Sequence, residues 1–305
     1  MSIVDMHFHT TFSDWKRTNK EVLEEAKRRD IKLLISLEHD IINIELIKLL
    51  KEHWIDSFEW TEISARDEIG KKSLHIWCYS KKISDEIKEI IKGVREWRRG
   101  KIWGQVELLE SSWFKIDYAN FTNYYEKKNV NLDNLNNSHI QEYILKNENN
   151  LELIKEIAWK WYNTETFIPD FLKKWWKYCK YWFREVERYE PSLKKLWEIT
   201  KKTNDFLSLV HPNFTFENDR KWFYKFIENY KDTIHWIEIN SKASKEWVQI
   251  IKETALKYDL ILTFWSDSHD FTDDKRHWNL WDMNEYIDEE EVNENIDRFK
   301  KFINK

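Results

Sequence analysis

Short apolar runs that alternate with amphipathic helical patterns constrain this chain more than any other feature of its sequence. Seven runs have the length and composition of buried strands, at 3–8, 32–37, 58–64, 74–79, 206–210, 235–240 and 260–264. Most are followed by a helical pattern, at 18–29, 41–52, 84–98, 191–203, 218–230, 242–258 and 289–303. Strands alternating with helices are typical of βα units around a largely parallel sheet. We therefore predict an α/β fold, an irregular (β/α)7 barrel.

The alternation is interrupted between residues 100 and 190. This stretch is polar and rich in Asn and Lys, and it has helical patterns at 105–112, 138–146, 151–160 and 169–176. We predict a small inserted helical subdomain over 100–190, and a barrel built from 1–99 and 191–305. The 305 residues suffice for one large domain that carries such an insertion.

The composition indicates a soluble globular protein. The formal net charge is −5, from 50 basic and 55 acidic residues, so no overall basic excess attracts nucleic acid. No apolar run approaches the roughly 20 residues that cross a bilayer, and the first residues do not resemble a signal peptide. Cys78 and Cys179 are far apart in sequence and are typical of reduced thiols. We expect a cytoplasmic protein with no membrane contact and no obligate protein partner.

Histidine, glutamate or aspartate stands at or near six of the seven predicted strand ends. His7 and His9 point to the same side of the first strand, because side chains alternate along a strand. In barrels of this kind the chemistry gathers at the carboxyl ends of the strands. A lone histidine in a strand is usually structural, but six such ends on one rim indicate a site. The nine candidates are His7, His9, Asp14, His39, Glu62, His75, His211, Asp267 and His269.

The residue types at these strand ends indicate a metal centre. Imidazole and carboxylate ligands without thiolates suit Mn, Zn or Fe in catalytic sites. Nine candidates exceed what one ion uses, so we predict two or three divalent ions, with a carboxylate such as Glu62 bridging two of them. Paired ions generate hydroxide at neutral pH and stabilise phosphoryl transfer. Phosphoester hydrolysis is therefore the predicted chemistry.

Six segments, taken in order, resemble a known family. They read DMHFHTTFSDW (5–15), LEHD (37–40), TEIS (61–64), LHIWCY (74–79), LVHPNF (209–214) and WSDSHD (265–270). Together they are similar to the motifs of the PHP (polymerase and histidinol phosphatase) metal-dependent phosphoesterases. Each motif alone is weak, whereas six in the same order are specific. The resemblance covers the predicted barrel and implies a metal-dependent phosphoric ester hydrolase.

The resemblance implies a ligand role for each of the nine candidates. One ion would be held by His7, His9, Glu62 and Asp267, a second by Glu62, His75 and His211, and a third by Asp14, His39 and His269. Asp5, Glu38 and Asp40 would lie behind the ligands and orient them. Glu38 departs from the family pattern, in which Asp usually precedes the histidine.

The helical insertion resembles one branch of the family. That branch contains nucleotide phosphatases and 5′–3′ oligoribonucleotide exonucleases, which implies a 3′,5′-bisphosphonucleotide, a nucleotide or a short RNA end as substrate. Histidinol phosphate is the alternative within the class. A non-catalytic binding or accessory module is the alternative of another class. Candidate phosphate contacts, which equally fit a solvated charged surface, are Arg184, Arg188, Lys173, Lys174 and His139.

The chain contains 19 Trp but only 4 Gly. The two counts together come close to the usual glycine share of about 7%. Several tryptophans stand where the family motifs carry glycine or where a helix should end in glycine, namely Trp15, Trp54, Trp60, Trp77, Trp113, Trp175, Trp176, Trp236 and Trp265. Some genetic codes read the codon UGA as Trp and others read it as Gly. We interpret these positions as glycines of the native protein, and the alternative is a Trp-rich protein that stacks bases on its indoles.

Overall fold

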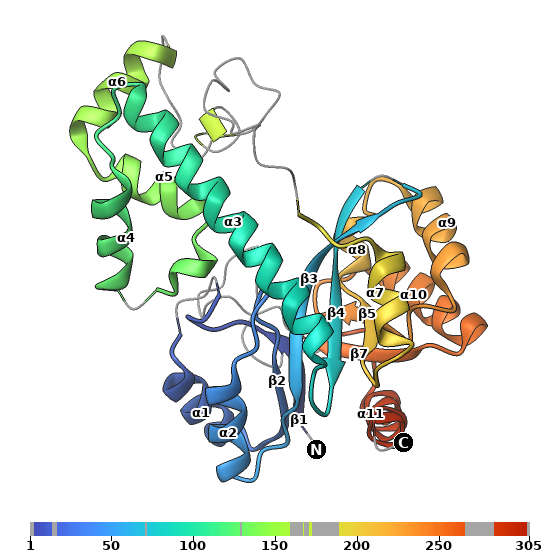
Figure 1. The fold of residues 1–305 in the computed structure, drawn as a ribbon. Coiled ribbons are helices and arrows are strands. Elements are labelled where there is room, and N and C mark those ends of the chain that lie inside the picture. Colours follow the sequence, from blue (N-terminus) through green and yellow to red (C-terminus); the bar gives the residue numbers. More distant parts are fainter. Residues whose placement is uncertain are drawn as a thin grey trace. The chain divides into compact units, whose positions relative to one another are not determined.

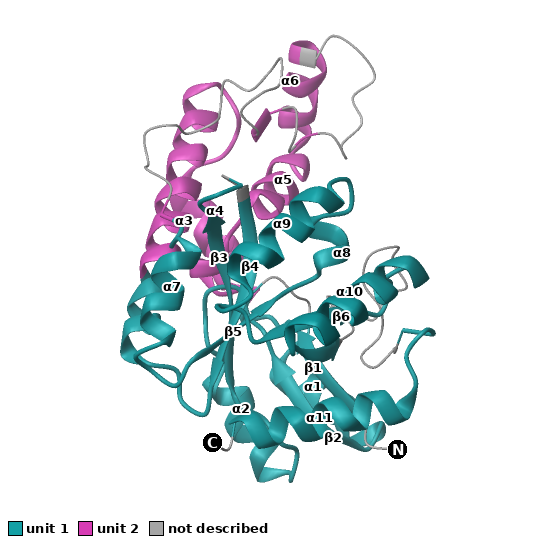
Figure 2. Cartoon of the chain, turned by 90° about the vertical axis from the view of Figure 1, so that its right-hand side faces the viewer, with its two compact units in different colours: residues 1–92, 190–305 teal, residues 93–189 magenta. Residues whose placement is uncertain are grey.

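The structure is a computed structural model of the chain, and it describes residues 3–13, 17–70, 72–128, 130–158, 167, 171–172, 189–265 and 284–303. The chain divides into two compact units (Figure 2). Unit 1 comprises Met1–Lys92 and Glu190–Lys305, and unit 2 comprises Gly93–Tyr189. The first division falls earlier than the predicted boundary after residue 99, and it lies within one continuous helix, α3 (Asp85–Ser111).

All seven predicted strands are present in unit 1, close to their predicted bounds (Figure 1). They are β1 (Ile3–Phe8), β2 (Ile31–Ser36), β3 (Glu59–Asp67), β4 (Lys72–Ser80), β5 (Phe206–Leu209), β6 (Trp236–Asn240) and β7 (Ile261–Trp265). β1 and β2 pair in parallel, and the other five form one sheet in the order β3-β4-β5-β6-β7. The mixed α/β class predicted from the alternation is confirmed.

The two-stranded sheet contacts both edge strands of the five-stranded sheet, β3 and β7. Two isolated parallel bridges, Leu33 with Asp56 and His39 with Glu62, connect the chain around β2 to β3. On the other side β1 lies beside β7. Within the described residues no hydrogen-bonded ladder joins β1 to β7, so closure of the barrel stays a prediction.

The prediction of a largely parallel sheet is wrong for β4. This strand runs antiparallel to both β3 and β5, whereas β5, β6 and β7 are mutually parallel. The physical reason is the short connection between Asp67 and Lys72. A parallel neighbour needs a crossover of a dozen or more residues, and a connection this short permits only a hairpin.

Helices with one apolar face accompany the strands of unit 1. They are α1 (Asn19–Arg28), α2 (Ile44–Glu52), α7 (Leu193–Thr200), α8 (Pro212–Thr215), α9 (Arg220–Tyr230), α10 (Lys245–Tyr258) and α11 (Glu289–Ile303). The predicted capping box of α1 is confirmed, because Thr18 Oγ1 accepts from the Glu21 amide and the Glu21 carboxylate accepts from the Thr18 amide. None of the described helices is both long and apolar enough to cross a membrane.

Unit 2 is helical and has its own apolar core. It contains the continuation of α3, then α4 (Tyr118–Glu126), a 3-10 turn (Leu132–Asn134), α5 (Asn137–Leu145) and α6 (Glu148–Ala158). Val106, Phe121 and Ile140 are among the buried residues of this core. The predicted helix at 105–112 belongs to α3, and α4 lies where no helix was predicted. The predicted helix at 169–176 falls almost entirely outside the described residues.

Two tryptophans adopt the left-handed backbone conformation in which glycine is favoured. Trp54 follows α2 with φ 63° and Trp113 follows α3 with φ 75°. At each site two backbone hydrogen bonds close the helix end in a Schellman arrangement, as when the amides of Trp54 and Ile55 donate to Lys51 and Leu50. The two side chains are 93% and 83% exposed, so packing does not hold them there. The prediction that both positions are helix C-caps is confirmed.

Three further tryptophans are buried together inside unit 1. Trp60, Trp77 and Trp236 are at most 1% exposed, and their indole nitrogens have no hydrogen-bond partner. Trp60 lies 5.6 Å from each of the other two, measured between ring centroids. Buried Trp N–H groups usually find an acceptor. The core around these three side chains therefore provides no acceptor for their indole N–H groups.

Candidate metal centre

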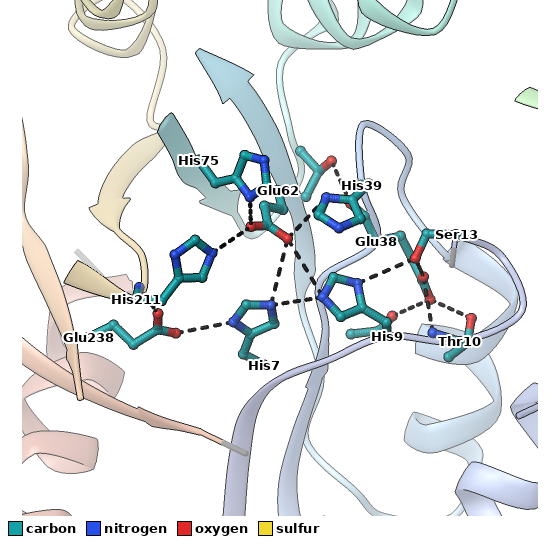
Figure 3. A network of polar contacts seen from close by, with 12 residues as sticks. His7, His9, Thr10, Ser13, Glu38, His39, Glu62, His75, His211 and Glu238 are labelled. Carbon is teal, nitrogen blue, oxygen red and sulfur yellow. Dashed lines mark hydrogen bonds and ion pairs between the residues drawn. The ribbon is translucent and has the colours of Figure 1, made fainter. Parts of the chain in front are cut away.

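Five histidines surround one buried carboxylate in unit 1 (Figure 3). The carboxylate is that of Glu62 on β3, which is 1% exposed. Its two oxygens face different groups of imidazoles. The five are His7, His9, His39, His75 and His211.

The first carboxylate oxygen of Glu62, Oε1, contacts two imidazoles. His75 Nδ1 lies 2.7 Å away and His211 Nε2 lies 3.3 Å away. His75 reaches this oxygen because it pairs with Ser64 across the β3–β4 ladder, and Ser64 is on the same face of β3 as Glu62. His211 follows β5 and precedes Pro212, the first residue of α8.

The second oxygen of Glu62, Oε2, is buried and makes no hydrogen bond. It lies 3.2 Å from His39 Nδ1, 3.6 Å from His9 Nε2 and 3.7 Å from His7 Nε2. The parallel bridge between His39 and Glu62 places the first of these. The strand alternation predicted for β1 brings His7 and His9 to one side, where their Nε2 atoms are 3.1 Å apart.

Glu238 on β6 orients the histidines and was missed by the sequence analysis. Its Oε1 lies 3.2 Å from His7 Nδ1, and its Oε2 accepts a hydrogen bond from the backbone amide of His211. Glu238 is completely buried. A signal was present, since WIEIN (236–240) is a buried strand with one charged residue, and a buried charge requires partners.

Glu38 forms a second polar network behind the first. Its carboxylate accepts from Ser36 Oγ at 2.6 Å, Ser13 Oγ at 2.5 Å and the Thr10 amide at 3.1 Å, and also from the Thr10 hydroxyl and the Asn43 amide group. The hydroxyl of Ser13 lies 3.3 Å from His9 Nδ1. Glu38 thus acts on His9 through Ser13. The Glu38 side chain thus reaches five donors at this position.

Asp5 and Asp40 brace the backbone of the same region. Asp5 Oδ1 accepts from the His7 amide at 3.1 Å. Asp40 has a positive φ of 55°, its amide donates to the Glu62 carbonyl at 2.9 Å, and its Oδ1 accepts from the Ser64 amide at 3.3 Å. Both carboxylates therefore accept hydrogen bonds from the strands that carry the candidate ligands His7 and Glu62.

The electrostatics of the centre favour an ionised Glu62. Burial alone would raise the pKa of this carboxyl group. The charges of His39 and His75, together with a hydrogen bond from His211, outweigh the burial and hold the pKa of Glu62 well below its ordinary value. The carboxylate therefore carries a negative charge that is available to a cation.

The donor set fits divalent metal ions. The Nδ1 atoms of His7 and His9 face a carboxylate and a hydroxyl, which assigns their protons to Nδ1 and leaves a lone pair on each Nε2. Two lone pairs 3.1 Å apart repel unless a cation lies beside them. Two groups have ligand atoms that lie within 4.8 Å of one another, namely His7, His9 and Glu62, and His39, Glu62 and His75.

Several predicted site residues lie outside the described residues. They are the candidate ligands Asp14, Asp267 and His269 and the candidate phosphate contacts Arg184, Arg188, Lys173 and Lys174. His139 is described and lies in unit 2, where its Nδ1 accepts from the Asn136 amide at 3.1 Å in a cap of α5. Cys78 is buried in β4, and Cys179 is not described.

Comparison with known proteins finds solved structures with a similar fold. No protein-family model matches the sequence, and no curated protein matches it. Among solved structures, a proposed metal-dependent phosphoesterase from Bifidobacterium adolescentis is similar at TM-score 0.68 and 19% identity, over 97% of this chain and 96% of its own. An amidohydrolase from Chromobacterium violaceum, solved with bound sulfate and no metal, is similar at TM-score 0.66 and 18% identity over 90% of each chain. At these identities the likeness shows a shared fold.

Proposed function

We propose that this chain is a metal-dependent phosphoesterase that hydrolyses phosphomonoesters or short nucleic-acid 5′ ends. One observation carries the proposal. The buried Glu62 Oε2 makes no hydrogen bond and has three imidazole nitrogens within 3.7 Å. A buried polar atom without a partner is costly, and a cation shared with the imidazoles removes that cost.

The described residues supply most of two adjoining ligand sets. His7, His9 and Glu62 form one, and His39, His75 and Glu62 form the other, with His211 beside it. Mn, Zn or Fe ions suit such imidazole and carboxylate donors. When bound, they supply an activated hydroxide and a Lewis acid for phosphoryl transfer. Glu62 bridges the sets, and we place Asp14, Asp267 and His269 among the remaining ligands.

The remaining residues fix protons and orientations. Glu238 accepts the Nδ1 proton of His7 and so keeps the Nε2 lone pair directed toward Glu62. Ser13 accepts the Nδ1 proton of His9 and donates its own proton to Glu38. Such partners fix the tautomer of a ligating histidine and raise its basicity. The chain therefore favours one tautomer of His7 and of His9 before any ion binds.

The similar structures support a phosphoryl substrate. The Bifidobacterium protein is itself proposed to be a metal-dependent phosphoesterase, and the Chromobacterium amidohydrolase binds sulfate. Sulfate and phosphate are both tetrahedral oxyanions. These properties belong to those proteins, and we transfer them to this chain only as part of the proposal.

Release of phosphate from p-nitrophenyl phosphate in the presence of Mn²⁺ tests the proposed function. We expect turnover that EDTA abolishes and Mn²⁺ restores, with metal analysis giving two or three ions per chain. A panel of 3′,5′-bisphosphoadenosine, AMP, 5′-phosphorylated RNA and histidinol phosphate then ranks substrates. Metal binding without turnover of any member would identify the accessory-module alternative, and preference for histidinol phosphate would identify the other.

A further inference from the structure

Two histidines of the metal centre have hydrogen-bond partners that fix which ring nitrogen carries the proton. His7 Nδ1 lies 3.2 Å from Glu238, a carboxylate that can only accept hydrogen bonds. His9 Nδ1 lies 3.3 Å from the hydroxyl of Ser13, which donates its own proton to Glu38. Both arrangements place the proton on Nδ1 and leave a lone pair on Nε2 (Figure 3). Each of these two rings is therefore set in one tautomer.

His211 has a partner of a different kind. Its Nδ1 lies 3.2 Å from Thr215 Oγ1, and among the described residues that hydroxyl has no further hydrogen-bond partner. A hydroxyl can donate a hydrogen bond and can also accept one. The Thr215 hydroxyl therefore pairs with Nδ1 whether or not this nitrogen carries a proton. Both neutral tautomers of His211 remain open to it.

The other ring nitrogen of His211 faces the Glu62 carboxylate. Nε2 lies 3.3 Å from Glu62 Oε1, which can only accept a hydrogen bond. This contact assigns the proton of the neutral ring to Nε2, so that Nδ1 accepts from the Thr215 hydroxyl. A histidine binds a metal ion through an unprotonated nitrogen. Use of Nε2 as a ligand therefore requires the proton to stand on Nδ1, where Thr215 Oγ1 accepts from it.

The backbone of His211 is fixed on both sides of the ring. Its φ is 29°, in the left-handed region that few residues other than glycine adopt. The His211 amide donates to Glu238 Oε2. The His211 carbonyl accepts from the amides of Phe214 at 2.9 Å and Thr215 at 3.0 Å. Pro212 follows directly and disfavours the right-handed helical conformation at the residue before it. The ring therefore keeps its place when its proton changes nitrogen.

We propose that Thr215 is a positioning residue that holds the His211 ring toward Glu62 in either neutral tautomer. With the proton on Nε2, His211 donates to Glu62. With the proton on Nδ1, His211 donates to Thr215 and directs the Nε2 lone pair to a divalent cation. One proton leaves Nε2 and one is gained at Nδ1, so the charge of the ring is unchanged. The inference rests on the proposed function, because it concerns the ligand set beside His211.

The exposure of the three side chains agrees with this difference. Those of His7 and His9 are at most 1% exposed, whereas that of His211 is 17% exposed. Solvent that reaches His211 can take up the proton from one nitrogen and supply a proton to the other. His7 and His9 have little such access and have partners that require one tautomer. His211 is therefore the adaptable histidine of the three.

Two-bond proton–nitrogen NMR correlation spectra of the full chain, labelled with 15N-histidine, test the inference because they distinguish the two neutral tautomers. Spectra are compared in EDTA and with Zn²⁺, which is diamagnetic, at a pH well above the ordinary pKa of histidine. We expect His211 to carry its proton on Nε2 in EDTA and on Nδ1 with Zn²⁺, and His7 to carry it on Nδ1 in both. The loss of one signal in His211→Gln assigns it. The same tautomer of His211 in both samples would overturn the inference.

Substitutions of Thr215 test its role through metal binding, measured by equilibrium dialysis with Mn²⁺. Thr215→Val removes the hydroxyl at similar volume, and Thr215→Ser retains it. We expect Thr215→Val to weaken the binding of one ion about tenfold, the lower end of what such partners contribute. Thr215→Ser should bind as the unchanged protein does. In activity assays, Thr215→Val should need more Mn²⁺ but recover its kcat at saturation, since the hydroxyl acts through His211.

Thr200→Val is the matched control, because it removes the same hydroxyl from a threonine of α7 that donates to the Trp197 carbonyl at 3.2 Å. We expect its Mn²⁺ affinity to equal that of the unchanged protein. Equal weakening in the control and in Thr215→Val would contradict the role of Thr215. So would a Thr215→Ser variant that binds as poorly as Thr215→Val. If Thr215→Val does not fold, the spectra of the unchanged protein and the binding by Thr215→Ser still decide.

Turnover of p-nitrophenyl phosphate separates this inference from the proposed function. Metal-dependent turnover by a protein whose His211 stays in one tautomer would remove only the role given to Thr215. Binding of Zn²⁺ with the expected change of tautomer, but with no turnover of any phosphoester, would remove the proposed function and leave that role in place. A chain that binds no divalent ion would overturn both.

Discussion

The candidate metal centre and the aromatic cluster beside it, formed by Trp60, Trp77, Tyr79 and Trp236, are both buried in unit 1. They differ in whether their buried polar atoms have hydrogen-bond partners. The rings of His7 and Trp77 meet edge to face, 4.9 Å apart, where the two regions join. In the centre, Glu38 and Glu238 accept several hydrogen bonds each. In the cluster, the indole nitrogens of Trp60, Trp77 and Trp236 and the Tyr79 hydroxyl have no partner.

The difference teaches how to interpret an unsatisfied buried atom. At Glu62 Oε2 the surrounding groups are imidazole nitrogens, so a cation, as the proposed function requires, would supply the missing partner. Around the indoles the neighbours are aromatic and aliphatic, and Trp236 and Tyr79 stack with centroids only 3.5 Å apart. No ligand would serve those donors. The simpler explanation is that the side chains exceed what these positions are built to hold, as the glycine interpretation requires.

The largest effect should come from Glu62→Gln. Removing the bridging charge should lower kcat with p-nitrophenyl phosphate by about a thousandfold, because metal-centred charge stabilisation is worth several kcal/mol of the barrier. The uncharged amide also binds the ions poorly, so metal analysis should show fewer of them. The control is Glu52→Gln at the exposed end of α2, which should keep full activity. Full activity of Glu62→Gln would mean that the centre is not the catalytic site.

Trp236→Gly tests whether the aromatic cluster stabilises the fold. A well-fitted buried aromatic residue costs about 3–5 kcal/mol of unfolding free energy when removed, and we expect this loss for Phe264→Gly on the adjacent strand. Trp236→Gly should cost less than about 1 kcal/mol, because it also removes an unpaired donor. Urea unfolding gives both values. Equal losses, or native peptides whose mass corresponds to Trp at position 236, would show that the indole belongs to the core.

Glu238→Gln should have an intermediate effect through metal affinity. Partners that orient a ligating histidine typically contribute 10- to 100-fold in affinity or activity. We expect the Mn²⁺ concentration for half-maximal activity to rise by roughly that factor, with kcat largely recovered at saturating Mn²⁺. A Mn²⁺ titration of phosphatase activity measures it. An unchanged titration curve would show that Glu238 does not orient His7.

Much of the fold could be predicted because the strands of unit 1 are short, apolar and well separated. The direction of β4 could not, because the prediction followed the strand–helix rhythm and gave no weight to the short connection between Asp67 and Lys72. The helix α4 was missed for a different reason. Its outward stripe carries Asn and Tyr rather than strong helix formers, so the segment resembles a polar loop.

The candidate site was predictable where ligand types stand at strand ends, as at His7, His39 and His211. Residues that act through others were harder to find. Glu238 lies inside an apolar strand, and Ser13 and Asn43 are ordinary in loops. Their roles depend on contacts between segments far apart in sequence, which no local pattern encodes. By contrast, the positions of Trp54 and Trp113 were predictable, because a helix end has a local signature.

The smallest effect concerns those two helix ends. Trp54→Gly and Trp113→Gly should each raise the unfolding free energy by about 1 kcal/mol, because a residue with a Cβ pays roughly that much in the left-handed region. The exposed indoles contribute little packing that could be lost. Lys201→Gly is the control, since this helix end has an ordinary φ of −66° and glycine there should not stabilise. Thermal unfolding of the three variants decides the matter. If Trp54→Gly and Trp113→Gly destabilise as Lys201→Gly does, these helix ends do not call for glycine, and the strongest local support for the glycine interpretation is lost.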